Sequence, residues 1–519
     1  MVQGALDFGS QRQRWTPSPY QEAIFAAVED PDGGNIAVRA RAGSGKTSTI
    51  CEAVRRMPRG ARILVAAFNR DIREELARRL PLGIDVLTTH GLGMRAVQRA
   101  QAHSRLDKDK LKRLVGAVWP ALDAGPWRTA TSKLIARAKA TLARTPEDLD
   151  ACVDAAGICL EDLVPRARRT RYGLSPEQAA ELRAQLVEEA GKVLIACAES
   201  SERFDFDDML WLPVVHGWAP ASERGGGWDW VVIDEAQDLS RVQLELIASA
   251  LAPGGRVLVV GDDRQAIYGF RGADSRAFDA LVERFSCTVL PLSITYRCPA
   301  SVVDLARKLV PDYEAGEGAP AGSVTSAPAL PIQSLLPGDF VLSRKNAPLV
   351  RHAIKTLAAG IPAAIAGRDL AKDLGVILGV MARRCGGDRE RVISALTEHY
   401  GRRLQEAAKR ELDPGPISDE LDCLLALLDA RPAVQESVDL LDRLCAEKPG
   451  NVVLFSSVHR AKGLERDRVW LLLGTFRADF DGSVEVRPGR RGNAQEELNL
   501  LYVATTRAKK ALVLVSGEG

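Results

Sequence analysis

The stretch Ile36-Ala-Val-Arg-Ala40-Arg-Ala-Gly-Ser-Gly-Lys46-Thr47 decides how the first part of the chain folds. It begins with a short apolar run, typical of a buried strand, and Thr47–Met57 after it has a helical pattern. A loop of small residues between a strand and a helix points backbone N–H groups at the helix N-terminus, where the dipole favours anions. The stretch therefore predicts a phosphate-binding loop in an α/β lobe.

The loop predicts its own nucleotide ligands. Lys46 is expected to reach the β- and γ-phosphates, and the Thr47 hydroxyl is expected to bind Mg²⁺. The alternative is a glycine-rich turn that binds nothing, and the order of strand, loop and helix disfavours it. The other predicted nucleotide-binding residues of the loop are Ala42, Gly43, Ser44, Gly45 and Ser48.

A second apolar run, Val231–Ile233, ends in the acidic pair Asp234-Glu235. In a nucleotide hydrolase, Asp234 would hold Mg²⁺ and Glu235 would orient or deprotonate the attacking water. Such a pair taken alone is more often a solvated strand end. Together with the upstream loop, it predicts an ATP-hydrolysing site.

Short apolar runs alternate with helical patterns at both ends of the chain, which predicts two α/β lobes with parallel sheets. The first set of predicted strands is Ile36–Ala40, Arg62–Phe68, Val86–Thr89, Trp230–Asp234 and Val257–Gly261. The second set is Val289–Leu292, Phe340–Ser343, Val452–Ser456, Val469–Leu473 and Ala511–Val515.

Each lobe is interrupted by a mainly helical insertion, predicted over 91–201 and 369–449. Within the second insertion, Arg391–Tyr400 and Arg402–Leu412 are predicted to be two helices that meet at Gly401. Ala315–Gly338 is rich in Pro, Gly, Ala and Ser and is predicted to be a long loop.

Composition excludes several classes of protein. The 519 residues carry 70 Lys and Arg against 68 Asp and Glu, so the net charge of +2 excludes a polybasic coat. The nine cysteines form no CxxC pair, which disfavours a zinc or iron–sulfur site. Neither a signal peptide nor a run long enough to span a membrane is found. These features predict a cytoplasmic protein without membrane contact.

Further motifs follow in order along the chain. They are Thr16–Gln21 (TPSPYQ), Phe68-Asn69, Thr88–His90, Phe204–Asp208 (FDFDD), Asp234–Asp238 (DEAQD), Gly261–Ala273 (GDDRQAIYGFRGA), Thr295–Arg297 (TYR), His459–Glu465 (HRAKGLE) and Leu501–Ala508 (LYVATTRA). Together they resemble the motifs of the UvrD-like superfamily 1A DNA helicases, in the order of that family, over most of the chain. The small size is similar to phage-encoded members and to the F-box DNA helicase branch.

The resemblance implies two RecA-like P-loop lobes, each carrying a helical insertion. Residues 1–90 and 202–278 would form the first, ATP-binding lobe, and 91–201 its insertion. Residues 279–368 and 450–519 would form the second lobe, and 369–449 a reduced insertion.

The resemblance also implies roles for residues outside the loop. Gln21 would read the adenine edge, Tyr296 would stack on the adenine face, and Glu465 would contact the ribose. Gln265 would sense the γ-phosphate. Arg297 and Arg507 would be arginine fingers supplied by the second lobe. Alone, each of these has an ordinary alternative, such as a core aromatic or a surface ion pair, and the register of the whole set favours the functional role.

Single-stranded DNA binding needs aromatic platforms and basic or polar side chains. The residues predicted to contact DNA are Phe68, Asn69, His90, Tyr268, Phe270, Arg271 and His459. Core packing is the alternative for Tyr268 and Phe270. The basic clusters Lys133–Arg144 and Arg166–Arg171 are candidates too, although such a run is more often a solvated helix face. One departure from the family is Arg41, which stands in the loop where a small residue is usual.

The sequence therefore predicts an ATP- and Mg²⁺-dependent DNA helicase that moves along single-stranded and forked DNA. The polarity implied by the resemblance is 3′ to 5′. A monomer or weak self-association is expected, and no protein partner is indicated. Two alternatives stay open: a translocase that displaces proteins without separating strands, and a DNA-binding scaffold with weak ATPase activity.

Overall fold

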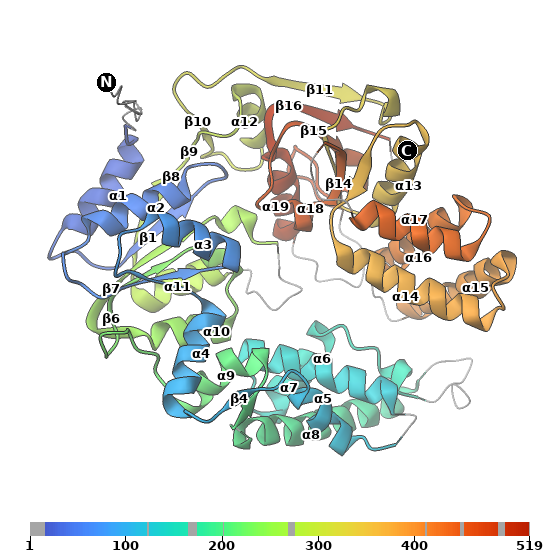
Figure 1. Ribbon diagram of the computed structural model, residues 1–519, viewed down its shortest axis with the longest axis horizontal. Helices are drawn as coiled ribbons and strands as arrows, with labels where there is room; N and C mark the ends of the chain where they lie inside the picture. Colours follow the sequence, from blue (N-terminus) through green and yellow to red (C-terminus); the bar gives the residue numbers. More distant parts are fainter. Residues whose placement is uncertain are drawn as a thin grey trace, which may run out of the picture.

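The computed structural model describes residues 16–121, 124–164, 174–200, 202–267, 276–409, 413–446, 451–485 and 494–517. In these residues the chain forms two six-stranded parallel sheets, each with helices on both faces (Figure 1). The prediction of two α/β lobes with parallel sheets is confirmed.

The first sheet lies in the blue and green part of Figure 1. Its spatial order is β3 (Asp85–Thr88), β2 (Ile63–Ala67), β6 (Trp228–Ile233), β7 (Leu251–Gly261), β1 (Ile36–Ala40) and β8 (Thr288–Leu292). Successive side chains of a strand point to opposite faces. Val38 accordingly packs into one buried core and its neighbour Ala37 into another. Both faces are covered, which explains why the strands are near-continuous apolar runs.

The helices of the first lobe are α1 (Pro19–Glu29), α2 (Lys46–Arg56), α3 (Arg70–Arg79), α4 (Thr89–Ala100), α9 (Phe206–His216), α10 (Arg241–Ala248) and α11 (Ala277–Phe285). Several begin at well-formed caps. Ser18 caps α1 in a reciprocal capping box with Gln21, and the Asn69 side chain accepts from Ile72 N at the start of α3.

The second sheet is built in the same way. Its order is β11 (Ser323–Ala327), β16 (Ala508–Val515), β15 (Arg466–Leu472), β12 (Phe340–Ser343), β14 (Val453–Ser457) and β13 (Ala363–Ile365). Its helices are α12 (Ala300–Ala306), α13 (Asn346–Ala358), α18 (Val458–Ala461) and α19 (Ala494–Thr505). A separate pair, β9 (Ile294–Thr295) with β10 (Glu314–Ala315), lies between the two sheets in sequence.

One strand was assigned to the wrong lobe. The run Val289–Leu292 belongs to β8, which pairs with β1 along its whole length, so it completes the first sheet and not the second. The predicted boundary at 278/279 therefore falls too early, and the first sheet ends at Leu292. The pattern misled because a buried strand of either sheet has the same apolar character.

Two further expectations are wrong. The predicted loop Ala315–Gly338 contains β11, which pairs with β16 at the sheet edge, where small and polar residues are tolerated. The predicted break at Gly401 is absent, because α15 (Arg389–Lys409) runs through it. Gly401 is half-buried, with open space where a Cβ would stand, and a single glycine costs a helix only about 1 kcal/mol.

The two insertions are helical. The first holds α5 (Lys110–Val118), α6 (Gly125–Thr141), α7 (Pro146–Ala155) and α8 (Pro176–Glu199), joined to the lobe by the short pair β4 (Arg105–Leu106) and β5 (Arg203–Phe204). The second holds α14 (Arg368–Arg384), α15, α16 (Gly415–Asp429) and α17 (Val434–Ala446). Figure 1 shows them as separate helical groups below and beside the lobes.

A buried ionic cluster fastens the first insertion to its lobe. The Asp208 carboxylate on α9 accepts from Lys110 Nζ of α5 and from Lys139 Nζ of α6, both at 2.7 Å. Lys110 also donates to the Cys197 carbonyl, and Asp205 lies 3.5 Å from Lys139. Lys139 was predicted within a DNA-contacting basic cluster, and its burial against Asp208 removes it from that role.

Replacing Asp208 by asparagine should destabilise the protein by about 3–5 kcal/mol, because it leaves two buried ammonium groups without their shared counter-charge. The melting temperature of the purified chain measures this. Glu188→Gln, which removes a solvent-exposed partner of Lys192, is the control and should cost less than about 1 kcal/mol. Equal melting temperatures for the two variants would show that the cluster contributes nothing.

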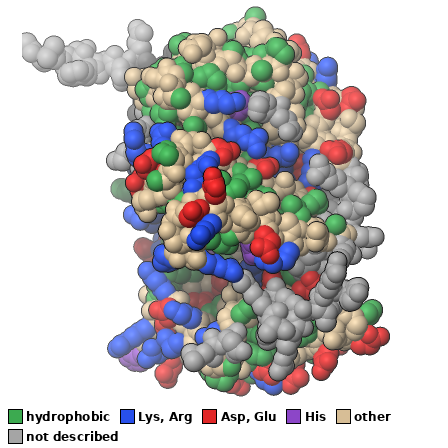
Figure 2. Space-filling view, turned by 90° about the vertical axis from the view of Figure 1, so that its right-hand side faces the viewer, with side chains coloured by type: hydrophobic (Ala, Val, Ile, Leu, Met, Phe, Trp, Pro, Cys, Tyr) green, Lys and Arg blue, Asp and Glu red, His purple; other side chains and the backbone are tan. Residues whose placement is uncertain are grey.

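The surface and thiol chemistry agree with the composition. All nine cysteines are free thiols. Within the described residues, no helix combines the length and the apolar character needed to span a membrane. On the face that Figure 2 shows, basic and acidic side chains are interspersed.

Candidate functional site

The phosphate-binding loop lies between β1 and α2, as predicted. Its glycines are needed where they stand: Gly43 and Gly45 have φ of 74° and 82°, a conformation that other residues rarely adopt. A Cβ on Gly43 would also lie 2.6 Å from Arg297 Cβ and from Thr295 Oγ1. The first-lobe loop is therefore in direct contact with the second-lobe motif that follows β9.

Lys46 and the acidic pair meet behind this loop. Lys46 Nζ lies 2.7 Å from Glu235 Oε1, and the Glu235 N–H donates to Asp234 Oδ1 at 2.9 Å. Glu235 has a φ of 50°, so a non-glycine residue is held in the left-handed region at this turn. Strain of this kind persists where surrounding contacts fix the residue, and such sites are often functional.

Burial and charge set the protonation of the acidic pair. Burial, followed by the adjacent Glu235 carboxylate, raises the pKa of Asp234 to about 7. Burial would also raise the pKa of Glu235, but the charges of Lys46 and Lys462 and the hydrogen bonds from Lys46 and Gln237 together outweigh it and lower that pKa to about 2. Burial would lower the pKa of Lys46, but Glu235, Asp262 and Asp234 together outweigh it and raise that pKa. The pair thus presents an anionic Glu235 and an Asp234 that lacks a full counter-charge.

Hydrogen bonds continue from Glu235 to Gln265. Gln237 Nε2 donates to Glu235 Oε2 at 2.5 Å, and Gln237 Oε1 accepts from the Asp262 N–H at 2.9 Å. Gln265 Nε2 then donates to Asp262 Oδ2 at 2.6 Å. The predicted γ-phosphate sensor is therefore connected to the acidic pair through buried polar groups.

Lys462 reaches into this network from the second lobe. Its Nζ donates to Asp238 Oδ2 at 2.5 Å and to the Gln265 carbonyl at 2.8 Å. Asn499 Nδ2 of α19 donates to the Ala266 carbonyl at 3.0 Å. The segment around Gln265 is consequently held by both lobes.

Two tyrosines of the second lobe bind the backbone N–H and the carbonyl of one loop residue, Ala42. The Ala42 N–H donates to Tyr502 Oη, and Tyr313 Oη donates to the Ala42 carbonyl, both at 2.9 Å. One residue further on, the Gly43 carbonyl accepts from the Tyr296 N–H at 2.9 Å. These bonds place the second lobe against the loop at several consecutive residues.

The two predicted arginine fingers differ in their surroundings. Arg297 lies against Gly43 and forms an ion pair with Glu465, the residue expected to contact the ribose. Arg507 is buried and donates to the carbonyls of Val503 and Leu464. Burial lowers the pKa of Arg507 to about 10, and nearby Arg297 adds to this effect. The structure therefore brings Arg297 to the loop and places Arg507 behind it.

The predicted adenine contacts also meet at the loop. Gln21 Nε2 lies 3.8 Å and Tyr296 Cδ2 4.0 Å from the position of a Cβ on Gly45. Gln21 is buried, donating to Thr49 Oγ1 and accepting from the Ser18 N–H. Tyr296 is 58% exposed, so its ring face is open to a planar ligand.

The remaining predicted residues differ in their burial and in their contacts. Ser48 accepts from Arg79 Nη2 at 3.0 Å, so α3 engages it. Asn69 caps α3 and Phe68 is half-buried before it, whereas His90 is exposed and His459 half-buried. The predicted DNA contacts Tyr268, Phe270 and Arg271, and the cluster Arg166–Arg171, lie outside the described residues.

Several residues of the site were not predicted from the sequence. They are Arg41, Asp238, Asp262, Tyr313, Lys462, Asn499 and Tyr502. All but Asn499 and Tyr313 lie inside the stretches quoted in the sequence analysis, which was the available signal. Tyr313 follows no motif and could be found only from the fold.

The residues fit a magnesium nucleotide. Ser44 Oγ is buried in the loop with no hydrogen-bond partner among the described residues, as expected of a group that meets a phosphate oxygen. The raised pKa of Asp234 marks a site where a cation would relieve charge repulsion from Glu235. Thr47 lies in the first turn of α2, beside Lys46. Thr47 and Asp234 would hold the cation, which would neutralise charge on the phosphates.

Comparison with known families agrees with this geometry. The family described as UvrD/REP helicase N-terminal domain matches residues 20–286, and the UvrD-like helicase C-terminal domain matches residues 434–518.

Similar proteins carry related names. The F-box DNA helicase protein 1 of Schizosaccharomyces pombe is 27% identical over 527 residues, covering 95% of this chain and 57% of that protein. The ATP-dependent DNA helicase UvrD2 of Mycobacterium tuberculosis is 27% identical over 559 residues, covering 93% and 76%. DNA helicase IV of Escherichia coli is 25% identical over 353 residues, covering 60% and 49%. The chain thus spans little more than half the length of the fission yeast protein.

Proposed function

Since the chain belongs to the UvrD-like family of ATP-dependent DNA helicases, we propose that it couples ATP hydrolysis to movement along single-stranded DNA and separates duplex strands. One observation carries the proposal: the loop that would hold phosphate is built in the first lobe, and Arg297 of the second lobe lies against it. A nucleotide bound there contacts both lobes, so its hydrolysis changes how the lobes are held together.

Each side chain has a role in the proposed hydrolysis. Lys46 exchanges its ion pair with Glu235 for the β- and γ-phosphates. Glu235 then orients and deprotonates the attacking water. Asp234 and Thr47 hold Mg²⁺. Arg297 stabilises the charge that develops on the transferred phosphoryl group, and Arg507 joins it when the lobes close.

Around the phosphates, the remaining contacts recognise the nucleotide and report its state. Gln21 and Tyr296 bind the adenine, and Glu465 exchanges its ion pair with Arg297 for the ribose. Gln265, connected to Glu235 through buried polar groups, senses the γ-phosphate.

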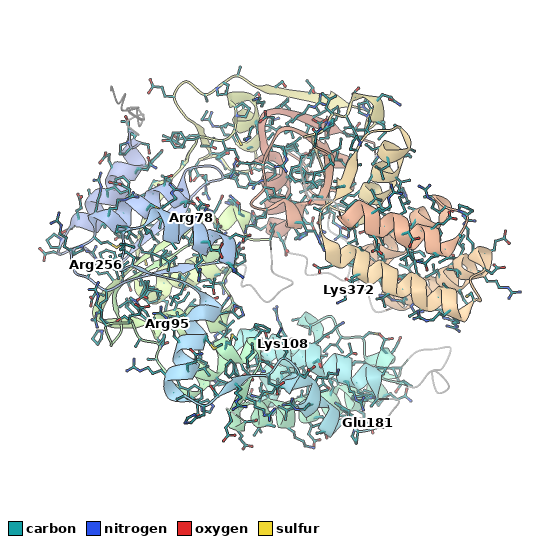
Figure 3. All side chains as sticks on the ribbon, viewed as in Figure 1. Arg78, Arg95, Lys108, Glu181, Arg256 and Lys372 are labelled. Atoms are coloured by element: carbon teal, nitrogen blue, oxygen red, sulfur yellow. The ribbon has the colours of Figure 1, made fainter. Side chains whose placement is uncertain are left out.

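An exposed aromatic adds to the proposed DNA surface. Phe206, at the start of α9, is 49% exposed, and Lys108 Nζ lies 6.0 Å from its ring centroid. In Figure 3, Lys108 and Lys372 of α14 lie on the sides of the two insertions that face one another. A stacking ring beside a cation suits a single strand, whose bases offer π-faces and whose backbone is anionic. Phe68, Asn69, His90 and His459 complete the proposed set.

The polarity that we propose is 3′ to 5′, with Mg²⁺ as the cation and forked DNA as the substrate. A cytoplasmic location and a monomer or weak self-association fit the same proposal.

The test measures ATP turnover with single-stranded DNA, with RNA of the same sequence and without nucleic acid, followed by unwinding of 3′- and 5′-tailed duplexes. We expect at least a tenfold stimulation by DNA and unwinding of the 3′-tailed duplex. Stimulation with protein displacement but no unwinding would identify a translocase. DNA binding without stimulated turnover would identify a scaffold and overturn the proposal.

Lys46→Ala should weaken ATP binding about 10- to 100-fold, because a hydrogen bond to a charged group contributes about 1.5–3 kcal/mol. Titration with a fluorescent ATP analogue measures the change. Lys192→Ala, on the exposed face of α8, is the control. An unchanged affinity in Lys46→Ala would remove the loop from nucleotide binding.

A further inference from the structure

Arg41 departs from the small residue that is usual in the loop, and its guanidinium makes an unusual set of contacts. Nη1 donates to Asp263 Oδ1 at 2.7 Å and to Asp262 Oδ1 at 3.2 Å. Nε and Nη2 donate to Asp312 at 2.8–3.0 Å. The side chain is only 4% exposed. One loop residue thus joins the Gln265 segment of the first lobe to a carboxylate of the second.

Asp312 belongs to a short segment whose three consecutive residues all bind the first lobe. Asp312 pairs with Arg41, Tyr313 donates to the Ala42 carbonyl, and Glu314 accepts from Tyr20 Oη at 2.7 Å. This segment belongs to the second lobe and moves with it, while it also contacts the loop. Its position at the loop therefore depends on how the lobes are arranged.

The two ends of the Arg41 network differ in their exposure to solvent. Asp262 is fully buried, and its other oxygen accepts from Gln265 Nε2 at 2.6 Å. Buried ion pairs of this kind are costly to break. The Asp312 side chain is 48% exposed, so water can take the place of its contact with Arg41 when the two separate. The Asp312 contact can therefore open while the contact with Asp262 remains.

We propose that Arg41 is a positioning residue that couples the arrangement of the lobes to Gln265. Asp312 holds the outer edge of the guanidinium when the lobes lie as they do here. When the second lobe moves, this hold is released, the guanidinium shifts against Asp262, and the Gln265 amide bound to Asp262 shifts with it. The proposal rests on the proposed function, since Gln265 is the γ-phosphate sensor only in that context.

The test acts at the exposed end, because Arg41→Ala would leave Asp262 buried without its partner and endanger folding. Asp312→Asn removes the charge, and Asp312→Glu restores it. The matched control is Asp279→Asn, which breaks the exposed pair with Arg39, two positions before Arg41 and wholly within the first lobe. Melting temperatures, the KM for ATP, turnover with and without single-stranded DNA, and amide hydrogen exchange of nucleotide-free protein are measured for all four proteins.

Asp312→Asn should lower the factor by which DNA stimulates turnover about three- to fivefold, leaving KM, DNA-free turnover and melting temperature within twofold or 2 °C of the wild type. Peptides covering residues 262–267 should exchange faster than in Asp279→Asn. Asp312→Glu should recover most of the stimulation.

The two proposals fail separately. A wild type whose turnover does not respond to DNA overturns the proposed function, while the exchange data still decide the role of Arg41. Equal exchange of residues 262–267 in Asp312→Asn and Asp279→Asn overturns the inference. So does an equal stimulation factor in those two variants when the wild type is stimulated.

Discussion

Replacing Arg297 by alanine should reduce DNA-stimulated ATP hydrolysis about a thousandfold, since an arginine finger contributes about 10³–10⁵ in kcat. The expectation rests on where this side chain lies, against Gly43 of the loop and beside Glu465. Binding of ATP should weaken far less than turnover, because the loop amides and Lys46 remain. Steady-state kinetics with saturating single-stranded DNA, together with nucleotide titration, separate the two effects.

Arg351→Ala is the control for this change. Arg351 is a half-exposed arginine of the same lobe that lies 3.9 Å from Asp422 on α16, away from the loop. It should leave kcat within about twofold. If Arg297→Ala turned over ATP at a tenth of the wild-type rate or faster, Arg297 would be a structural ion-pair residue and the two-lobed site would lose its main support.

Replacing Glu235 by glutamine should lower ATP turnover about 10²- to 10⁴-fold, the range that a positioned general base contributes. Glutamine keeps the volume of the side chain and its contact with Gln237, but it cannot accept the proton of the attacking water. The variant should still bind ATP and single-stranded DNA, and we expect it to accumulate with ATP bound. Single-turnover hydrolysis and filter binding of labelled ATP measure both properties.

Glu283→Gln, an exposed position on α11, provides the matched substitution and should behave as the wild type. Normal turnover in Glu235→Gln would assign the pair Lys46–Glu235 a structural role only. Loss of ATP binding as well as turnover would mean that the glutamine disturbs the turn held at a φ of 50°.

Much of the fold could be predicted because buried parallel strands are apolar runs, and β1 and β12 have the predicted limits. The prediction that failed was the sheet to which one of these strands belongs. The sequence around Val289 is compatible with either sheet, and only pairing with β1 decides between them. The edge strand β11 could not be seen either, since Ser323–Ala327 is short and polar and is ordered by β16.

In the candidate site, too, some residues could be predicted from the sequence and others could not. The loop and the acidic pair were recognisable because their chemistry needs fixed residue types at short spacings, and Arg297 was recognisable through the resemblance of its motif to the helicase family. The partners of Arg41 lie more than 220 positions away in sequence, so no local pattern could indicate them. Lys139 was misjudged for a related reason: nothing in a basic helix tells which lysine turns inward to meet Asp208.

The pairing of β8 with β1 limits how far Arg297 can move away from the first lobe. The first sheet ends at Leu292, and Arg297 is only five positions later, with Arg41 N–H bound to the Leu292 carbonyl at 3.0 Å. An extended chain spans at most about 3.3–3.6 Å per residue, so this tether keeps Arg297 within about 17 Å of the sheet edge. However far the remainder of the second lobe moves, Arg297 stays closer to the first sheet than the width of a small domain. It therefore needs only a short movement to reach each newly bound nucleotide.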